Sequence, residues 1–180
     1  MEPFDSFLVW IADFLGDHLY EGIFLAALLE TIVPPIPTLA IFPTAGFLAS
    51  QQGIPFIGLI SMIILGAIGA TIGTSAIYLI ALKLGRVVLL RYLKYVKISE
   101  KKLERVEIWF EKYGDKAVFL GRMVPVMREM ISVPAGLLKM RIPKFVLYTF
   151  AGSCVWSSGT ILSGYYFGEA IGLGTGALSP

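Results

Sequence analysis

One stretch decides the fold, residues 119–138, which read FLGRMVPVMREMISVPAGLL. The stretch is apolar enough for a bilayer, yet it carries Arg122, Arg128, Glu129 and two prolines. Charge at membrane depth costs several kcal/mol, so a segment that keeps three charges usually uses them for binding or transport. On an unbroken helix Arg122 and Arg128 would point roughly 240° away from each other. Pro125 lies between them, and it breaks the helix so that both side chains can turn inward.

The composition of the chain as a whole is that of an integral membrane protein. The 180 residues are one domain's worth, 56% are hydrophobic, and the mean hydropathy of +0.76 exceeds the soluble norm. Residues 31–82 and 145–168 contain no charged side chain, and one crossing needs about 20 residues. We therefore exclude a soluble globular protein. The single Cys154 excludes an internal disulfide, and because the first residues lack the basic region of a signal peptide, we expect all of the chain to be mature protein.

The charges are segregated along the chain. Residues 1–82 hold six acidic and no basic residues, whereas residues 83–116 hold ten of the fifteen Lys and Arg. By the positive-inside rule the basic segment is cytoplasmic. A helix between Ser99 and Gly114 has an apolar stripe and a cationic side, which predicts a helix lying on anionic headgroups. An ordinary solvated linker helix is the alternative.

We expect a single membrane domain over residues 1–180 in which two helical hairpins enter and leave the membrane on one side. Each arm of the first hairpin is only about 18 Å long, too short for a hydrocarbon core of about 30 Å. The expected segments are an interfacial N-terminal helix (1–21), a first repeat (22–82), the basic segment (83–116), a second repeat (117–168) and a tail (169–180). In the first repeat the hairpin is broken at Pro34, Pro35 and Pro37, and the crossing is Ile54–Leu82. In the second repeat the hairpin is broken at Pro125 and Pro134, and the crossing is 145–168.

A short pattern occurs twice and indicates an internal repeat. Ala45-Gly46-x-Leu48 followed by Ile54-Pro55 resembles Ala135-Gly136-x-Leu138 followed by Ile142-Pro143. Since one crossing separates the copies, they have opposite orientations, as in many secondary transporters. The expected fold class is an all-α polytopic membrane protein with two inverted repeats, each a re-entrant helical hairpin followed by a transmembrane helix, and an amphipathic cytoplasmic helix between them. Coincidence among Gly and Pro residues in an apolar chain is the alternative.

Charged residues from both hairpins form the candidate site. Glu30 is the only acid in a long apolar stretch, and we expect it to accept a proton or, alternatively, only to neutralise one of the arginines. Arg122 and Arg128 are expected to bind an anion, and the two charges of a phosphate match two guanidinium groups. The alternative is that they reach for headgroups or backbone carbonyls. No metal or cofactor is predicted, and His18 is expected to be an exposed surface residue.

Motifs in both hairpins point to a known family. They are Glu30-x-x-x-Pro34-Pro35-x-Pro37 with Ala45-Gly46, then Phe119-x-Gly121-Arg122-x-x-Pro125-x-x-Arg128 with Pro134-Ala135-Gly136, and Trp156. Together they resemble the DedA family, also called the SNARE-associated or VTT family, from about Gly22 to Gly168. The resemblance implies a multi-pass protein of the bacterial cytoplasmic (inner) membrane with two opposed re-entrant hairpins, related to lipid scramblases. By position, Glu30, Arg122 and Arg128 match the family's functional acid and its two arginines.

Three positions depart from the family pattern. Leu39 and Thr74 stand where many members have acids, and Val126 stands where members have a glycine. If the missing acids carry protons in the family, ion coupling in this chain rests on Glu30 alone or is absent. The resemblance therefore supports the binding of a lipid phosphate more strongly than the coupling to an ion.

The expected function is that of a transporter, not an enzyme. Members of the family are linked to the return of undecaprenyl phosphate across the membrane for cell-wall synthesis, and coupling to the proton motive force is a further expectation. A proton-coupled small-ion or drug exporter and a general phospholipid scramblase are the alternatives. A lipid phosphatase is disfavoured, because the single His18 supplies neither a catalytic pair nor a metal cluster. The expected partners are the lipid phosphate and membrane lipids, no nucleic acid is expected, and the glycine faces permit a homodimer.

Overall fold

The computed structural model describes residues 16, 18–30, 38–95 and 100–176, and over these residues the protein is helical, without strands. The expected interfacial helix (1–21), apart from its last residues, and the expected breaks at Pro34, Pro35 and Pro37 lie outside the described residues, as does Ser99. The helices are α2 (Leu19–Glu30), α3 (Thr38–Gln51), α4 (Phe56–Tyr95), α5 (Glu100–Tyr113), α6 (Lys116–Arg122), α7 (Pro125–Met130), α8 (Ser132–Leu137) and α9 (Ile142–Gly176).

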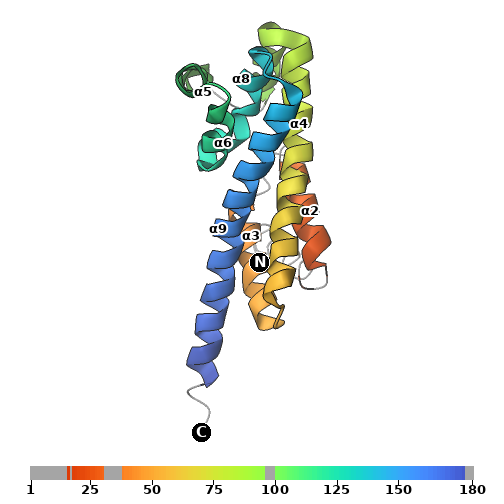
Figure 1. Ribbon diagram of the computed structural model, residues 1–180, viewed down its shortest axis with the longest axis vertical. Coiled ribbons are helices and arrows are strands. Elements are labelled where there is room, and N and C mark those ends of the chain that lie inside the picture. The colour runs from red at the N-terminus through yellow and green to blue at the C-terminus, as the bar shows by residue number, and fades with distance from the viewer. Residues whose placement is uncertain (1–15, 17, 31–37, 96–99, 177–180) are drawn as a thin grey trace.

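Two long helices, α4 and α9, form the spine of the molecule. They run antiparallel, with α2 and α3 around one end and α5 to α8 around the other (Figure 1). By length and composition, Phe56–Lys83 in α4 and Ile142–Ala170 in α9 could each cross a membrane. These stretches coincide with the two crossings expected from the hydropathy.

Helix α4 is longer than the sequence suggested. We expected the crossing to end at Leu82 and the basic segment to follow as a separate element, but the helix continues to Tyr95. The residues after Leu82 contain no proline, and Lys, Arg and Leu are good helix formers, so nothing stops the helix where the hydrophobic stretch ends. The expected surface helix is α5, which ends just before Gly114, whose φ of 56° favours glycine.

The short helices pack on the spine in a reciprocal way. Helix α2 packs on α4 and α3 packs on α9, whereas α6 packs on α9 and α8 packs on α4. Over residues 19–51, therefore, the first helix contacts the long helix that follows it and the second helix contacts the other long helix, and α6 and α8 do the same over residues 116–137. Helix α2 covers the small-residue face of α4, because a Cβ added to Gly69 would meet the Phe24 carbonyl at 2.4 Å.

Two apolar cores lie at the two ends of the spine, and a polar layer separates them. One core gathers around Phe42, Met62 and Ile161, and the other gathers around Tyr78 and Phe145. Between these cores α4 carries the buried hydroxyls of Thr71 and Thr74, and α9 carries those of Thr149, Ser153 and Ser157. The polar layer is where the ends of the hairpin helices meet the spine.

Candidate functional site

A break in the second hairpin places both arginines in the interior. Helix α6 ends at Arg122 and α7 begins at Pro125, with Val124 extended between them (φ −109°, ψ 122°). An extended residue before a proline is the expected geometry, because the proline ring disfavours the helical conformation there. Both guanidinium-bearing side chains are buried, with residue exposures of 2% for Arg122 and 5% for Arg128.

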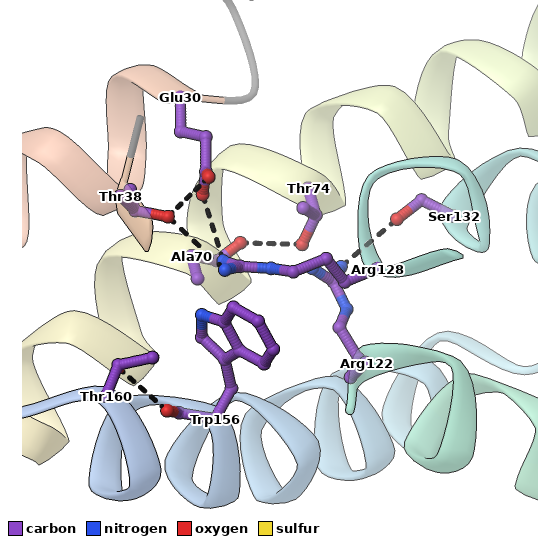
Figure 2. Close-up of polar contacts among 9 residues, drawn as sticks. All are labelled: Glu30, Thr38, Ala70, Thr74, Arg122, Arg128, Ser132, Trp156 and Thr160. Carbon is purple, nitrogen blue, oxygen red and sulfur yellow. Dashed lines mark hydrogen bonds and ion pairs between the residues drawn. The ribbon is translucent and has the colours of Figure 1, made fainter. Parts of the chain in front are cut away.

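Arg128 is held by the first hairpin. Its Nη2 lies 2.9 Å from Oε2 of Glu30, the last residue of α2, and its Nη1 donates to Oγ1 of Thr38, the first residue of α3, at 3.3 Å (Figure 2). The Thr38 hydroxyl donates in turn to Oε1 of Glu30 at 2.5 Å. Residues 98 positions apart in the chain thus form one hydrogen-bonded ion pair. A cation is favourable here, because the C-terminal end of α2 carries partial negative charge.

The indole ring of Trp156 lies against the other side of this ion pair. The guanidinium carbon of Arg128 is 4.8 Å from the centroid of the ring, which comes from the middle of α9 (Figure 2). A desolvated cation over the face of an indole is stabilised by the negative face of the ring. The centre is therefore built by four elements: α2, α3, α7 and α9.

Arg122 has a different environment. Its Nη2 donates to the Ser132 hydroxyl at 3.2 Å, and its buried Nε has no hydrogen-bond partner. In the part of the chain that the structure describes, no carboxylate lies within ion-pair distance of Arg122. A buried guanidinium without a counterion is costly, and an anionic ligand is the natural way to compensate it. Among the residues that the structure describes, one arginine is therefore in direct contact with a carboxylate, and the other is not.

The remaining residues of interest lie as follows. Thr74, at one of the two positions where the family resemblance leads us to expect an acid, is buried and donates to the Ala70 carbonyl at 2.6 Å. Leu39, at the other such position, is 60% exposed. Pro134 is the third residue of α8, in its first turn, where a missing N–H costs little, and Ile131 before α8 has helical backbone angles (φ −62°, ψ −23°). His18 is exposed, and the side chain of Glu129 lies outside the described residues.

Sequence reasoning missed the roles of Thr38, Ser132 and Trp156 in holding the arginines. Thr38 follows the proline-rich stretch 34–37 of the sequence and is the first residue of α3, and Ser132 is the first residue of α8. Both are polar residues in apolar surroundings, which was the available signal. Trp156 entered only through the family resemblance. Among the described residues no cluster of His, Cys, Asp and Glu could hold a metal ion.

Several known proteins are similar in sequence to this chain. The model of the VTT domain matches residues 35–166. Undecaprenyl phosphate transporter A of Staphylococcus aureus is 30% identical over 91% of this chain and 81% of its own length, and the protein of the same name from Bacillus subtilis is 37% identical over 84% and 73%. A Lactococcus lactis relative named alkaline phosphatase-like protein is 32% identical over 83% and 71%. No solved structure matches.

Proposed function

Because the chain belongs to the VTT-domain (DedA) family, we propose that it is a membrane transporter that moves undecaprenyl phosphate, a lipid phosphate carrier, across the bacterial cytoplasmic membrane for reuse in cell-envelope synthesis. The relatives from Staphylococcus aureus and Bacillus subtilis bear the name of such a transporter. The cargo is the lipid with its phosphate headgroup, and no chemical change of the lipid is part of the proposal.

The observation that carries the proposal is the unequal pairing of the two buried arginines. Arg128 is neutralised by Glu30, whereas Arg122 has no carboxylate within ion-pair distance among the described residues. A phosphate monoester carries between one and two negative charges at neutral pH, and guanidinium groups bind its oxygens in a bidentate way. A phosphate at this place neutralises Arg122 first and then competes with Glu30 for Arg128.

Glu30 gives the site a means of loading and releasing its cargo. When Glu30 is ionised it holds Arg128, and when it takes up a proton the attraction weakens and Arg128 becomes available to the phosphate. Proton uptake at Glu30 would thereby favour binding of the headgroup, and proton loss would favour its release. Thr74 has a hydroxyl where the family resemblance leads us to expect an acid, so the proposed proton coupling rests on Glu30.

The transport path requires the two hairpins to enter from opposite sides of the membrane. Two observations support this arrangement: the reciprocal packing of the hairpin arms on α4 and α9, and the concentration of Lys and Arg at the α5 to α8 end. In this topology the headgroup meets the arginines near the middle of the bilayer while the prenyl chain stays among the lipid tails. The α5 to α8 end is then cytoplasmic.

The first test is translocation of fluorescent undecaprenyl phosphate in proteoliposomes. We expect the parent to move the lipid, and Arg128→Ala and Arg122→Lys to slow it by about tenfold or more, because each loses charge-assisted hydrogen bonds to phosphate. The matched control is Lys144→Ala, which removes an exposed cation that pairs with Asp115. We expect this control to retain the parent's rate.

The result that overturns the proposal is a folded parent that moves no lipid above the level of empty liposomes. An ion gradient that the same liposomes dissipate in a Glu30-dependent way would then favour a small-ion exporter. If every variant including Lys144→Ala were slowed equally, the arginines would have no special role and general scrambling would be the better account.

A further inference from the structure

A row of unpaired polar atoms lies next to the arginines on one face of α9. The hydroxyls of Thr149 and Ser153, the indole Nε1 of Trp156 and the Nε of Arg122 are buried and have no hydrogen-bond partner. The residues Thr149, Ser153 and Arg122 are at most 3% exposed. Such groups are rare in protein interiors, because each unpaired buried donor costs about 1–3 kcal/mol.

The two hydroxyls differ from most of the other Ser and Thr hydroxyls of the spine. A Ser or Thr in a helix commonly donates to a carbonyl one turn earlier, which satisfies it without any other partner. Thr149 and Ser153 do not do so, although both lie inside a regular helix. The hydroxyls that do are those of Ser61, Thr71, Thr74, Ser75, Ser158, Thr160 and Ser163.

Helix geometry places Thr149, Ser153 and Trp156 on one face of α9. Positions 149, 153 and 156 recur at the spacing of a single helix face and extend over about 10 Å. Gly152 shows which face this is, because a Cβ added there would meet the Arg122 Cβ at 2.6 Å and the Phe119 carbonyl at 2.9 Å. The row therefore begins at Trp156, whose ring lies against Arg128 (Figure 2), and continues past Gly152, which adjoins Arg122, toward the α5 to α8 end, where α9 begins (Figure 1).

The chemistry of the row identifies its ligand. Indole Nε1–H and guanidinium Nε–H can only donate, so what they bind must accept hydrogen bonds, and the two hydroxyls can donate as well. Donors grouped with an unneutralised cation are suited to the oxygens of an anion. None of the unpaired buried atoms in the described ranges belongs to α2 or α3, so the row leads toward one end of the molecule only.

We propose that Arg122, Thr149, Ser153 and Trp156 line a path along which phosphate oxygens pass between the α5 to α8 end and the ion pair of Arg128 and Glu30. The row is longer than one phosphate group, which distinguishes a path from a single binding position. The identity of the cargo rests on the proposed function, because the phosphate oxygens of a lipid headgroup and of free phosphate are chemically alike. It adds neutral donors on α9 to the two arginines as determinants of transport.

Cysteine accessibility tests the path directly. In full-length protein carrying Cys154→Ser, we compare Thr149→Cys and Ser153→Cys with the control Thr71→Cys, whose position is also buried, at 7% exposure, but whose hydroxyl donates to the Ala67 carbonyl. The probes are an anionic and a cationic methanethiosulfonate of similar size, and each rate is divided by that reagent's rate with a free thiol. Vesicles of both orientations are labelled.

We expect the anionic probe to modify Thr149→Cys and Ser153→Cys at least about tenfold faster than Thr71→Cys, and faster than the cationic probe does, because a cationic site concentrates anions. The reaction should be fast from one side of the membrane only. Undecaprenyl phosphate or inorganic phosphate should slow it, and comparing the two shows which source of phosphate the path takes. Rates no higher than that of Thr71→Cys, or no preference for the anion, would overturn the path.

A second set of variants separates failure of the path from failure of the proposed function. Thr149→Val, Ser153→Ala and Trp156→Phe should each slow lipid translocation several-fold, while Thr71→Val should not. If the arginine variants stop transport but these variants run at the parent's rate and their cysteines are unreactive, the path is wrong and the transporter proposal stands. If the parent moves no lipid but inorganic phosphate still protects the two cysteines, the path stands and the lipid proposal is wrong.

Discussion

At the scale of single residues, the two arginines of one hairpin have different partners. Arg128 contacts Glu30, Thr38 and Trp156, whereas Arg122 contacts Ser132 and retains an unpaired Nε. A cation whose counterion can be neutralised by a proton is suited to switching, and a cation without a counterion is suited to permanent attraction. The proposed mechanism therefore assigns regulation to Arg128 and capture of the anion to Arg122.

Replacement of Glu30 by Gln tests the buried ion pair. The change leaves the Arg128 charge buried without its counterion, so we expect the free energy of unfolding to fall by about 3 kcal/mol. The matched control is Asp115→Asn, which breaks the exposed ion pair with Lys144. This change should alter the free energy of unfolding by less than about 1 kcal/mol. Thermal unfolding in detergent measures both.

Added lipid phosphate should restore the midpoint of Glu30→Gln toward that of the parent, because the phosphate supplies the missing negative charge. Equal midpoint shifts in Glu30→Gln and Asp115→Asn would contradict this account of the pair. A midpoint that does not respond to lipid phosphate would argue against phosphate binding at Arg128.

At the scale of elements, glycines set how closely the hairpins approach the spine. A Cβ added to Gly46 in α3 would lie 2.0 Å from the Ile161 carbonyl of α9, and one added to Gly136 in α8 would lie 2.5 Å from the Tyr78 carbonyl of α4. These are the glycines of the Ala-Gly pair that occurs twice in the sequence, and they contact α9 and α4 respectively. The repeated pattern in the sequence thus corresponds to two equivalent backbone contacts.

Substitution of these glycines by alanine should destabilise the protein. We expect Gly46→Ala and Gly136→Ala to lower the free energy of unfolding by about 1–3 kcal/mol, because the added methyl group meets backbone that cannot move away easily. Gly159→Ala is the control in α9, since a Cβ there has no neighbour within 4 Å and alanine favours a helix. Unfolding midpoints in detergent provide the measurement, and a stable Gly46→Ala protein would show that α3 and α9 are less closely packed than described.

At the scale of the whole molecule, two apolar cores enclose a polar layer. Helices α2 and α3 surround one end of the spine and α5 to α8 surround the other (Figure 1). The ion pair of Arg128 and Glu30 joins the two groups of helices. The polar groups of this layer are buried in the protein, so the donors and charges must satisfy one another or bind a ligand. The proposed transport site consequently lies in this polar layer.

Topology follows from this arrangement and can be measured separately from transport. Gln52, between α3 and α4, and Lys139, between α8 and α9, are both exposed and belong to opposite ends of the spine. In protein carrying Cys154→Ser, a membrane-impermeant thiol reagent should label Gln52→Cys only from the outside and Lys139→Cys only from the cytoplasm. Val155→Cys, on the exposed side of α9 between these ends, is the lipid-facing control and should not react. Labelling of Gln52→Cys and Lys139→Cys from the same side would rule out opposed hairpins.

The sequence by itself determined the properties that depend on neighbouring residues. Hydropathy indicated two long apolar helices, and the charge pattern indicated which end is basic. Pro125 indicated where the second hairpin breaks, because a proline constrains its own residue and the one before it. The motifs led to the family, and Glu30, Arg122 and Arg128 were named as the candidate site before their positions were known.

Only the tertiary structure decided which of these residues contact one another. It paired Glu30 with Arg128 rather than with Arg122, placed the Thr38 hydroxyl and the Trp156 ring on that pair, and left Thr149 and Ser153 as unpaired donors. The sequence could not show this, because the partners are far apart in the chain and meet only where glycines let the helices approach closely. Local patterns specify what each segment is, whereas the packing of distant segments decides which charge neutralises which.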